Sequence, residues 1–140
     1  MIKKILCAVD DTEFSKAAVT VAAELANGFG AELTILVVNK LTGAYGHGGA
    51  ATYLWNDATV KRLLDGATKV AQKAGVKAIK RADVESRDIG RAIVVYAEEH
   101  GINHIVVGTG GKSGVSRLVV GSISSDVVER AHCPVTVARV

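Results

Sequence analysis

The residues of this chain best suited to chemistry stand in one glycine- and serine-rich stretch near its C-terminal end. An apolar run leads into Gly108, and the stretch continues through Gly111 and Gly121 into a group of serine residues. Glycine has no Cβ atom, so backbone N–H groups can come close to an anion. Serine hydroxyls beside the unpaired N–H groups of a helix start add further donors at the positive end of the helix. The pattern is typical of a phosphate-binding loop.

Two familiar phosphate-binding motifs do not fit the spacing of this stretch. A P-loop, G-x4-G-K-[ST], would need its first glycine where Val106 stands. A dinucleotide fingerprint, G-x-G-x-x-G, that begins at Gly108 would need glycine where Ser113 stands. The spacing that is present is G-x2-G-x9-G-S, from Gly108 to Ser122.

This spacing, together with both ends of the chain, resembles the universal stress protein family in its nucleotide-binding branch. The matching end segments are Lys3-Lys-Ile-Leu-Cys-Ala-Val-Asp10 and Ala131-His-Cys-Pro-Val-Thr-Val-Ala-Arg139. The resemblance implies that the protein binds ATP or another adenine nucleotide, with or without Mg²⁺. The contacts that it implies are at Ala8, Val9, Asp10, Val38, Gly108, Thr109, Gly111, Lys112, Gly121, Ser122, Ile123 and Ser124.

The implied site has a phosphate end and a base end. The glycine loop and its serines would hold the phosphates, whereas Asp10 would lie near the base and the ribose, because a carboxylate beside a triphosphate would repel it. Val38 would face adenine through its main chain. Asp10 also has an alternative role as the N-cap of the helix that follows, which it shares with Asp11 and Thr12.

The leading interpretation is a binding module, a dimeric nucleotide-dependent protein of the stress response or of regulation. Two alternatives stay open. One is a slow ATPase or self-phosphorylating enzyme that uses a loop hydroxyl such as Ser122 or Ser124, although no catalytic base can be assigned. The other is a nucleotide-free dimeric scaffold. No metal site is expected, because Gly101 ends a helix between His100 and His104, which therefore do not share a helical face.

The composition limits the class of protein. The 140 residues are 49% hydrophobic and suit a single domain, 1–140, with one core of ordinary size. Seventeen Lys and Arg residues against 14 Asp and Glu residues give a net charge of +3, and the basic residues are scattered, so we expect no nucleic-acid partner. No apolar run approaches the ~20 residues that span a bilayer, and no signal region is visible, so we expect a cytoplasmic protein with no membrane partner. Cys7 and Cys133 are isolated and are expected to be reduced.

Apolar runs and helical periodicity alternate along the chain. The predicted strands cover residues 3–9, 33–39, 77–84, 103–108 and 134–139. The predicted helices cover about 14–25, 53–74, 89–101 and 123–131, and a glycine-rich loop covers 40–52. The apolar positions predicted to face inward include Phe14, Ala17, Ala18, Val21, Ala22 and Leu25 in the first helix and Ile123, Val127, Val128 and Ala131 in the last.

This alternation predicts an α/β fold, a five-stranded parallel sheet with helices on both faces. The periodicity does not give the strand order. The family resemblance implies the order 3-2-1-4-5, a Rossmann-like fold of the adenine nucleotide alpha hydrolase type. In that order the first strand lies beside the fourth, so Asp10 and the Gly108 loop meet at a topological switch point, where such sheets bind ligands. The resemblance also implies a homodimer in which strand 134–139, a short apolar edge, pairs with its twofold mate.

Overall fold

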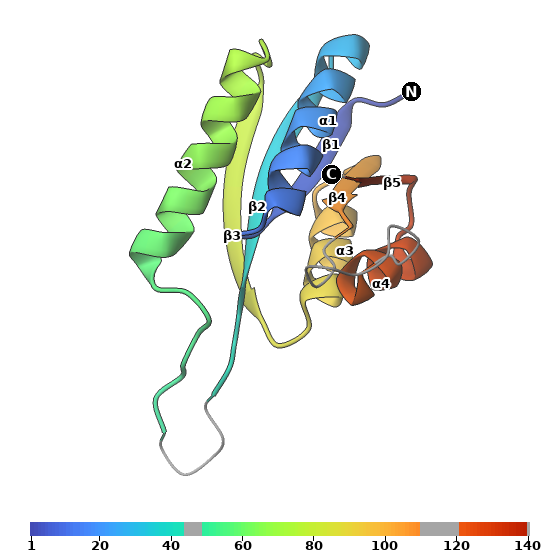
Figure 1. The fold of residues 1–140 in the computed structure, drawn as a ribbon. Helices are drawn as coiled ribbons and strands as arrows, with labels where there is room; N and C mark the ends of the chain where they lie inside the picture. The colour runs from blue at the N-terminus through green and yellow to red at the C-terminus, as the bar shows by residue number, and fades with distance from the viewer. Residues whose placement is uncertain (44–48, 110–120, 140) are drawn as a thin grey trace.

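The computed structural model describes residues 1–43, 49–109 and 121–139. Its elements in chain order are β1 (Lys4–Val9), α1 (Glu13–Phe29), β2 (Glu32–Lys40), α2 (Asp57–Lys73), β3 (Ile79–Ser86), α3 (Ile89–Glu99), β4 (His104–Gly108), α4 (Ser122–Arg130) and β5 (Val135–Ala138) (Figure 1). The strands form one parallel sheet in the order β3-β2-β1-β4-β5. The predicted fold class and strand order are therefore confirmed.

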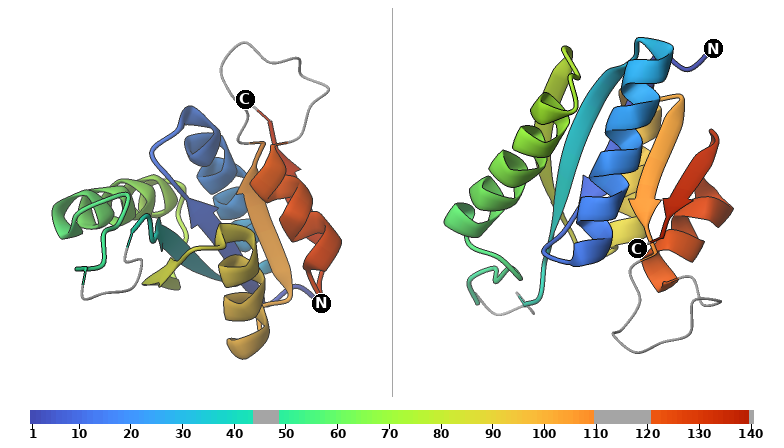
Figure 2. Two further views of the ribbon diagram at one scale, coloured as in Figure 1. Left: turned by 90° about the horizontal axis from the view of Figure 1, so that it is seen from below. Right: turned by 45° about the horizontal axis from the view of Figure 1, so that its top comes forward.

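Helices cover both faces of the sheet, with α1 and α2 on one side and α3 and α4 on the other (Figures 1 and 2). Each face has its own core. Ile5 and Cys7 of β1 belong to the core under α1 and α2, whereas Leu6 between them belongs to the core under α3 and α4. Because side chains alternate between the faces, a strand that is buried on both sides must be mostly apolar, as the middle parts of β1 and β2 are.

Helix boundaries follow local capping chemistry. Thr12, Asn56 and Asp88 are the N-caps of α1, α2 and α3, and each accepts a hydrogen bond from a backbone N–H in the first turn of its helix. Helix α1 ends where Gly30 takes a left-handed conformation with φ of 64°. Glycine adopts that conformation without a steric penalty, so the chain can turn directly into β2.

At its two described ends, the stretch predicted as a loop, 40–52, continues β2 beyond the sheet with antiparallel pairing. Leu41 bridges Tyr53, and the Leu54 N–H donates to the Lys40 carbonyl at 2.8 Å. Residues 44–48, which include His47, lie outside the described residues. The predicted start of the second helix at Tyr53 is therefore wrong, because residues 53–55 pair with the end of β2 and α2 begins only after Asn56.

Two helices present different faces from those that the apolar pattern predicts. The buried positions of α1 are mostly small: Ser15, Ala18, Val19, Ala22, Ala23 and Ala26. The larger Phe14, Val21 and Leu25 are only partly buried, because small side chains let the helix lie close to the sheet. In α4, Ile123 and Val128 are 40% and 51% exposed, although they were predicted to face inward.

Smaller differences concern strand limits and the cysteines. Strand β3 runs from Ile79 to Ser86 rather than over 77–84, and β5 is limited to Val135–Ala138. Both cysteine thiols are free, as predicted, and burial raises the pKa of Cys7 to about 12. Within the described ranges, no helix is both long and apolar enough to cross a membrane.

Candidate functional site: a cavity at the carboxyl ends of β1, β2 and β4

A cavity of about 100 Å³ lies where the carboxyl ends of β1, β2 and β4 meet the starts of α1, α3 and α4. Its lining contains these predicted site residues: Ala8, Val9, Asp10, Val38, Gly108, Ile123 and Ser124. It also contains residues that sequence analysis did not assign to the site: Phe14, Ser15, Trp55, Ile89, Ile93 and Val107. The structure therefore brings together residues from both ends of the chain, at the switch point between β1 and β4.

The remaining predicted site residues fall into three groups. Thr109 and Gly121 are absent from the cavity lining and are joined by a main-chain hydrogen bond, whereas Ser122 is exposed and lines a separate open groove of about 670 Å³ between the starts of α3 and α4. Gly111 and Lys112 lie outside the described residues.

Asp10 is held at the polar corner of the cavity by the first residues of α1. Its carboxylate accepts hydrogen bonds from the Thr12 N–H at 2.9 Å and from the Thr12 hydroxyl at 2.5 Å. Its own N–H donates to the Ser15 hydroxyl at 2.6 Å. Thr12 rather than Asp10 is the N-cap of α1, so the alternative capping role predicted for Asp10 belongs to its neighbour. Asp10 instead orients that cap.

Gly108 is required by packing, independently of any ligand. A Cβ atom at this position would lie 2.5 Å from the carbonyl oxygen of Phe14 and 2.7 Å from its carbonyl carbon. Both atoms belong to the backbone of the first turn of α1, so they cannot move aside as a flexible side chain would. The absence of a side chain at Gly108 therefore lets the start of α1 lie against the end of β4, which shapes one wall of the cavity.

We expect Gly108→Ala to destabilise the protein by about 1–3 kcal/mol, the usual cost of overpacking a well-packed interior. The shift in the denaturant midpoint of unfolding measures this cost. Gly66→Ala is the matched control, because Gly66 lies inside α2, where a Cβ would meet no described atom within 4 Å, and alanine there favours the helix. An unchanged midpoint for Gly108→Ala would contradict the close contact with Phe14.

Two hydrogen bonds hold the start of α4 against the end of β4. The Gly121 N–H donates to the Thr109 carbonyl at 2.7 Å, and the buried Ser124 hydroxyl donates to the Gly108 carbonyl. The Ser124 hydroxyl proton is therefore engaged by the main chain, and the predicted phosphate contact of Ser124 stays a prediction. Among the described residues no side chain caps α4, so the backbone N–H groups of its first turn are the donors that this end of the cavity offers.

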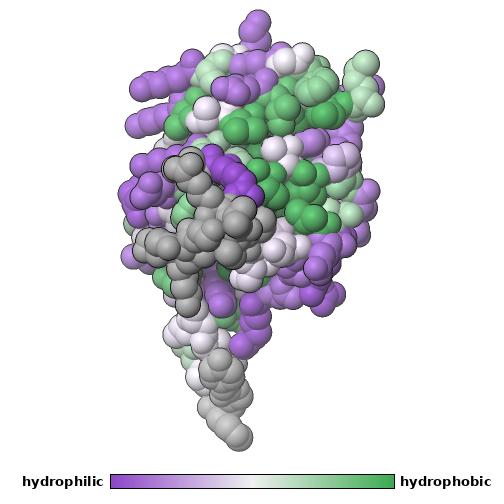
Figure 3. Space-filling model, turned by 45° about the vertical axis from the view of Figure 1, so that its right-hand side comes forward, coloured by the Kyte–Doolittle hydropathy of each residue, from purple (hydrophilic) through white to green (hydrophobic). Residues whose placement is uncertain are grey.

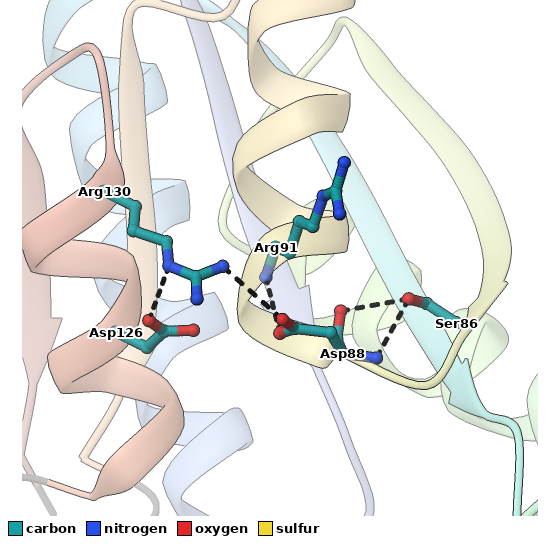
Figure 4. A network of polar contacts seen from close by, with 5 residues as sticks. All are labelled: Ser86, Asp88, Arg91, Asp126 and Arg130. Atoms are coloured by element: carbon teal, nitrogen blue, oxygen red, sulfur yellow. Dashed lines mark hydrogen bonds and ion pairs between the residues drawn. The ribbon is translucent and has the colours of Figure 1, made fainter.

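Helix α4 is tied to α3 by a network of charged groups (Figure 4). The Arg130 guanidinium lies 2.9 Å from a carboxylate oxygen of Asp126 and 3.4 Å from one of Asp88. The Asp88 carboxylate also accepts a hydrogen bond from the Arg91 N–H at the start of α3. The Ser86 hydroxyl donates to the Asp88 carbonyl and accepts from the Asp88 N–H. The Arg91 N–H, assisted by Arg130, lowers the pKa of the Asp88 carboxyl. The network thus ties the middle and the end of α4 to the start of α3, where Ile89 lines the cavity.

Trp55 is a candidate functional residue that sequence analysis did not identify. It is the only tryptophan in the chain, and the predicted helix over 53–74 included it. The capping residue Asn56, which follows it directly, was the available signal that the helix begins later.

Comparison with known proteins agrees with this architecture. The universal stress protein family matches residues 1–139 of the chain. A universal stress protein of Bacillus subtilis is 31% identical over 150 residues, a match that covers 99% of this chain and 100% of the relative.

Two solved structures have the same fold as this chain. One is a universal stress protein in complex with cAMP, with a TM-score of 0.75 and 23% identity, covering 97% of this chain and 95% of that one. The other is a universal stress protein from Archaeoglobus fulgidus in complex with dAMP, with a TM-score of 0.71 and 24% identity, covering 99% and 98%. Given the match along nearly its whole length, the chain belongs to the universal stress protein family.

Proposed function

We propose that this protein binds ATP or a related adenine nucleotide at the cavity between β1, β2 and β4. The proposal rests on one observation. Asp10, Val38 and Gly108 lie around one cavity together with the start of α4, at the switch point of the sheet. Ligands of open α/β sheets bind at such points, in pockets with apolar walls and a few polar groups.

The proposed orientation of the nucleotide follows the chemistry of the walls. The base lies among the apolar side chains of α3 and β2, beside Val38, and the ribose lies toward Asp10 and Ser15. The phosphates extend along Thr109, Gly121 and the first turn of α4, where backbone N–H groups and the helix dipole favour negative charge.

Support also comes from the sequence and from the structural neighbours. The G-x2-G-x9-G-S spacing adds Gly111, Lys112 and Ser122 to the proposed phosphate end. The two similar structures were solved with cAMP and dAMP, which are both adenine nucleotides.

The nucleotide-binding unit that we propose is a homodimer that serves the stress response or its regulation. Support comes from the edge strand β5, which pairs only with β4 among the described strands. Figure 3 brings the side with α4 and β5 forward and shows apolar side chains gathered there. Val128 of α4, 51% exposed, and the half-buried Val135 and Val137 of β5 are apolar residues of these elements.

Native mass spectrometry of the purified protein, followed by calorimetric titration of nucleotide-free protein with ATP, tests the proposal. We expect an added mass that corresponds to an adenine nucleotide, or saturable binding of one ATP per chain. Titrations with and without Mg²⁺ show whether the ion takes part. A protein that retains no nucleotide and gives no heat with millimolar ATP would contradict the proposed function and favour a nucleotide-free scaffold.

A further inference from the structure

The single tryptophan lines the proposed nucleotide cavity. Trp55 shares this lining with aliphatic side chains of other elements, among them Ile89 and Ile93 of α3. It is partly buried and packs against the core under α1 and α2. Besides Phe14 of α1, the cavity lining therefore has an aromatic residue that comes from the connection between β2 and α2.

The position of Trp55 is fixed by a buried amide. Asn39 of β2, only 6% exposed, donates from Nδ2 to the Trp55 carbonyl at 2.8 Å and accepts the Trp55 N–H on Oδ1 at 3.0 Å. One side chain thus satisfies both backbone polar groups of Trp55. A buried amide that loses its partners is costly, so this pair holds the residue in one place.

The neighbours of Trp55 are fixed on both sides. On one side, Tyr53 and Leu54 pair with the extension of β2. On the other side, Asn56 caps α2 by accepting the Thr59 N–H at 2.8 Å. Trp55 is therefore held between two ordered segments, and its main chain is positioned before any ligand arrives. A preorganised main chain loses little conformational entropy on binding.

The chemistry of the cavity suits a flat aromatic ring. Its lining is mostly apolar, with Val38, Ile89 and Ile93 among its side chains. Nucleobases stack on aromatic side chains, and the interaction depends on the ring face rather than on hydrogen bonds. Asp10 and Ser15 lie at the same cavity, where the sugar hydroxyls of a nucleoside would need polar partners.

We propose that Trp55 is a binding residue for the nucleobase, and that the Asn39–Trp55 pair positions it. The inference rests on the proposed nucleotide binding and goes further by assigning the aromatic contact to one residue. Its consequence is that the base, and not the phosphates alone, determines affinity at this cavity.

The fluorescence of Trp55 tests the contact without any substitution, because no other tryptophan contributes. We expect ATP and adenosine to change the emission in a saturable manner. Tripolyphosphate, which has the phosphates without the base, should leave the emission unchanged. An emission that does not respond to bound ATP, or that responds equally to tripolyphosphate, would overturn the inference.

Substitution gives a second measure. We expect Trp55→Ala to weaken ATP binding in calorimetry by about 5- to 150-fold, the range for loss of one base–aromatic stack. Trp55→Phe, which keeps an aromatic face, should retain most of the affinity. Leu54→Ala is the matched control, because Leu54 is adjacent, 53% exposed and absent from the cavity lining.

The outcomes separate the two proposals. If the unsubstituted protein does not bind ATP, the proposed function fails. If it binds ATP while folded Trp55→Ala binds equally well, only the role of Trp55 fails. Circular dichroism establishes whether Trp55→Ala is folded, and where it is not, the emission of the unsubstituted protein decides.

Discussion

Gly121→Val should weaken ATP binding by about 5- to 150-fold while leaving the protein folded. Gly121 directly precedes α4, and its N–H donates to the Thr109 carbonyl at 2.7 Å. In the proposed site the phosphates approach the backbone here, and a branched side chain would occupy that space. An intruding side chain costs about 1–3 kcal/mol, and 1.4 kcal/mol corresponds to a tenfold change in affinity.

The backbone at Gly121 does not itself require glycine. Its φ of −62° and ψ of 158° are open to any residue, so valine introduces no strain in the main chain. This separates Gly121 from Gly108, where a Cβ atom would collide with the Phe14 backbone and the expected effect is on stability. The two glycines of one sequence motif thus serve different purposes.

Calorimetric titration with ATP and thermal unfolding of the same samples measure the two effects. Gly28→Val is the matched control, because Gly28 lies in the last turns of α1, where a Cβ would meet no described atom within 4 Å, and does not line the cavity. It should bind ATP as the unsubstituted protein does. Equal affinities of Gly121→Val and Gly28→Val for ATP would show that the start of α4 does not bind the phosphates.

The order of helices and strands could be predicted from the sequence because each element has a local signal of its own. Apolar runs mark strands buried on both faces, and caps such as Asp88 mark helix starts within a few residues. The strand order came instead from the family resemblance, and the structure confirms it. The predicted residues at the ends of β1 and β4 meet because that order makes these strands neighbours.

The errors arose where distant residues decide the structure. Trp55 is placed by Asn39, 16 residues away, and no periodic pattern records such a pair. The exposure of Val128 depends on how little of α4 the sheet edge can cover, which is also a property of the assembled fold. Gly108 matched the predicted motif, yet its packing reason lies in Phe14, at the other end of the chain.

Val137→Lys should convert the proposed dimer into a monomer or cause aggregation. The carbonyls of Pro134 and Ala138 accept N–H groups from the β4 side, at 3.0 Å each, so the alternate residues Val135 and Val137 direct their backbone polar groups away from β4. That free edge can pair with a second copy. In a twofold antiparallel pair, each substitution would occur twice and bring like charges together in a desolvated interface.

The side chains of β5 are divided between the two faces of its own sheet. Val135 and Val137 pack against the core under α3 and α4, whereas Ala138 belongs to the opposite core and Thr136 contacts His104 through its hydroxyl at 2.7 Å. Neither set of β5 side chains is therefore reserved for a partner. A lysine at Val137 would also disturb the protomer, so its effect on folding must be measured separately.

A backbone substitution avoids that difficulty. Val137→Pro removes the N–H that points to the free edge, and proline is tolerated on edge strands at such positions. Sedimentation at micromolar concentration should show dimers for the unsubstituted protein and monomers for folded Val137→Pro. Val95→Lys, a change at a 36% exposed valine on α3, is the control and should remain dimeric. Among the described strands, β5 alone offers its backbone at that end of the sheet. A monomeric unsubstituted protein, or a dimeric Val137→Pro variant, would therefore show that dimers do not form through the β5 edge.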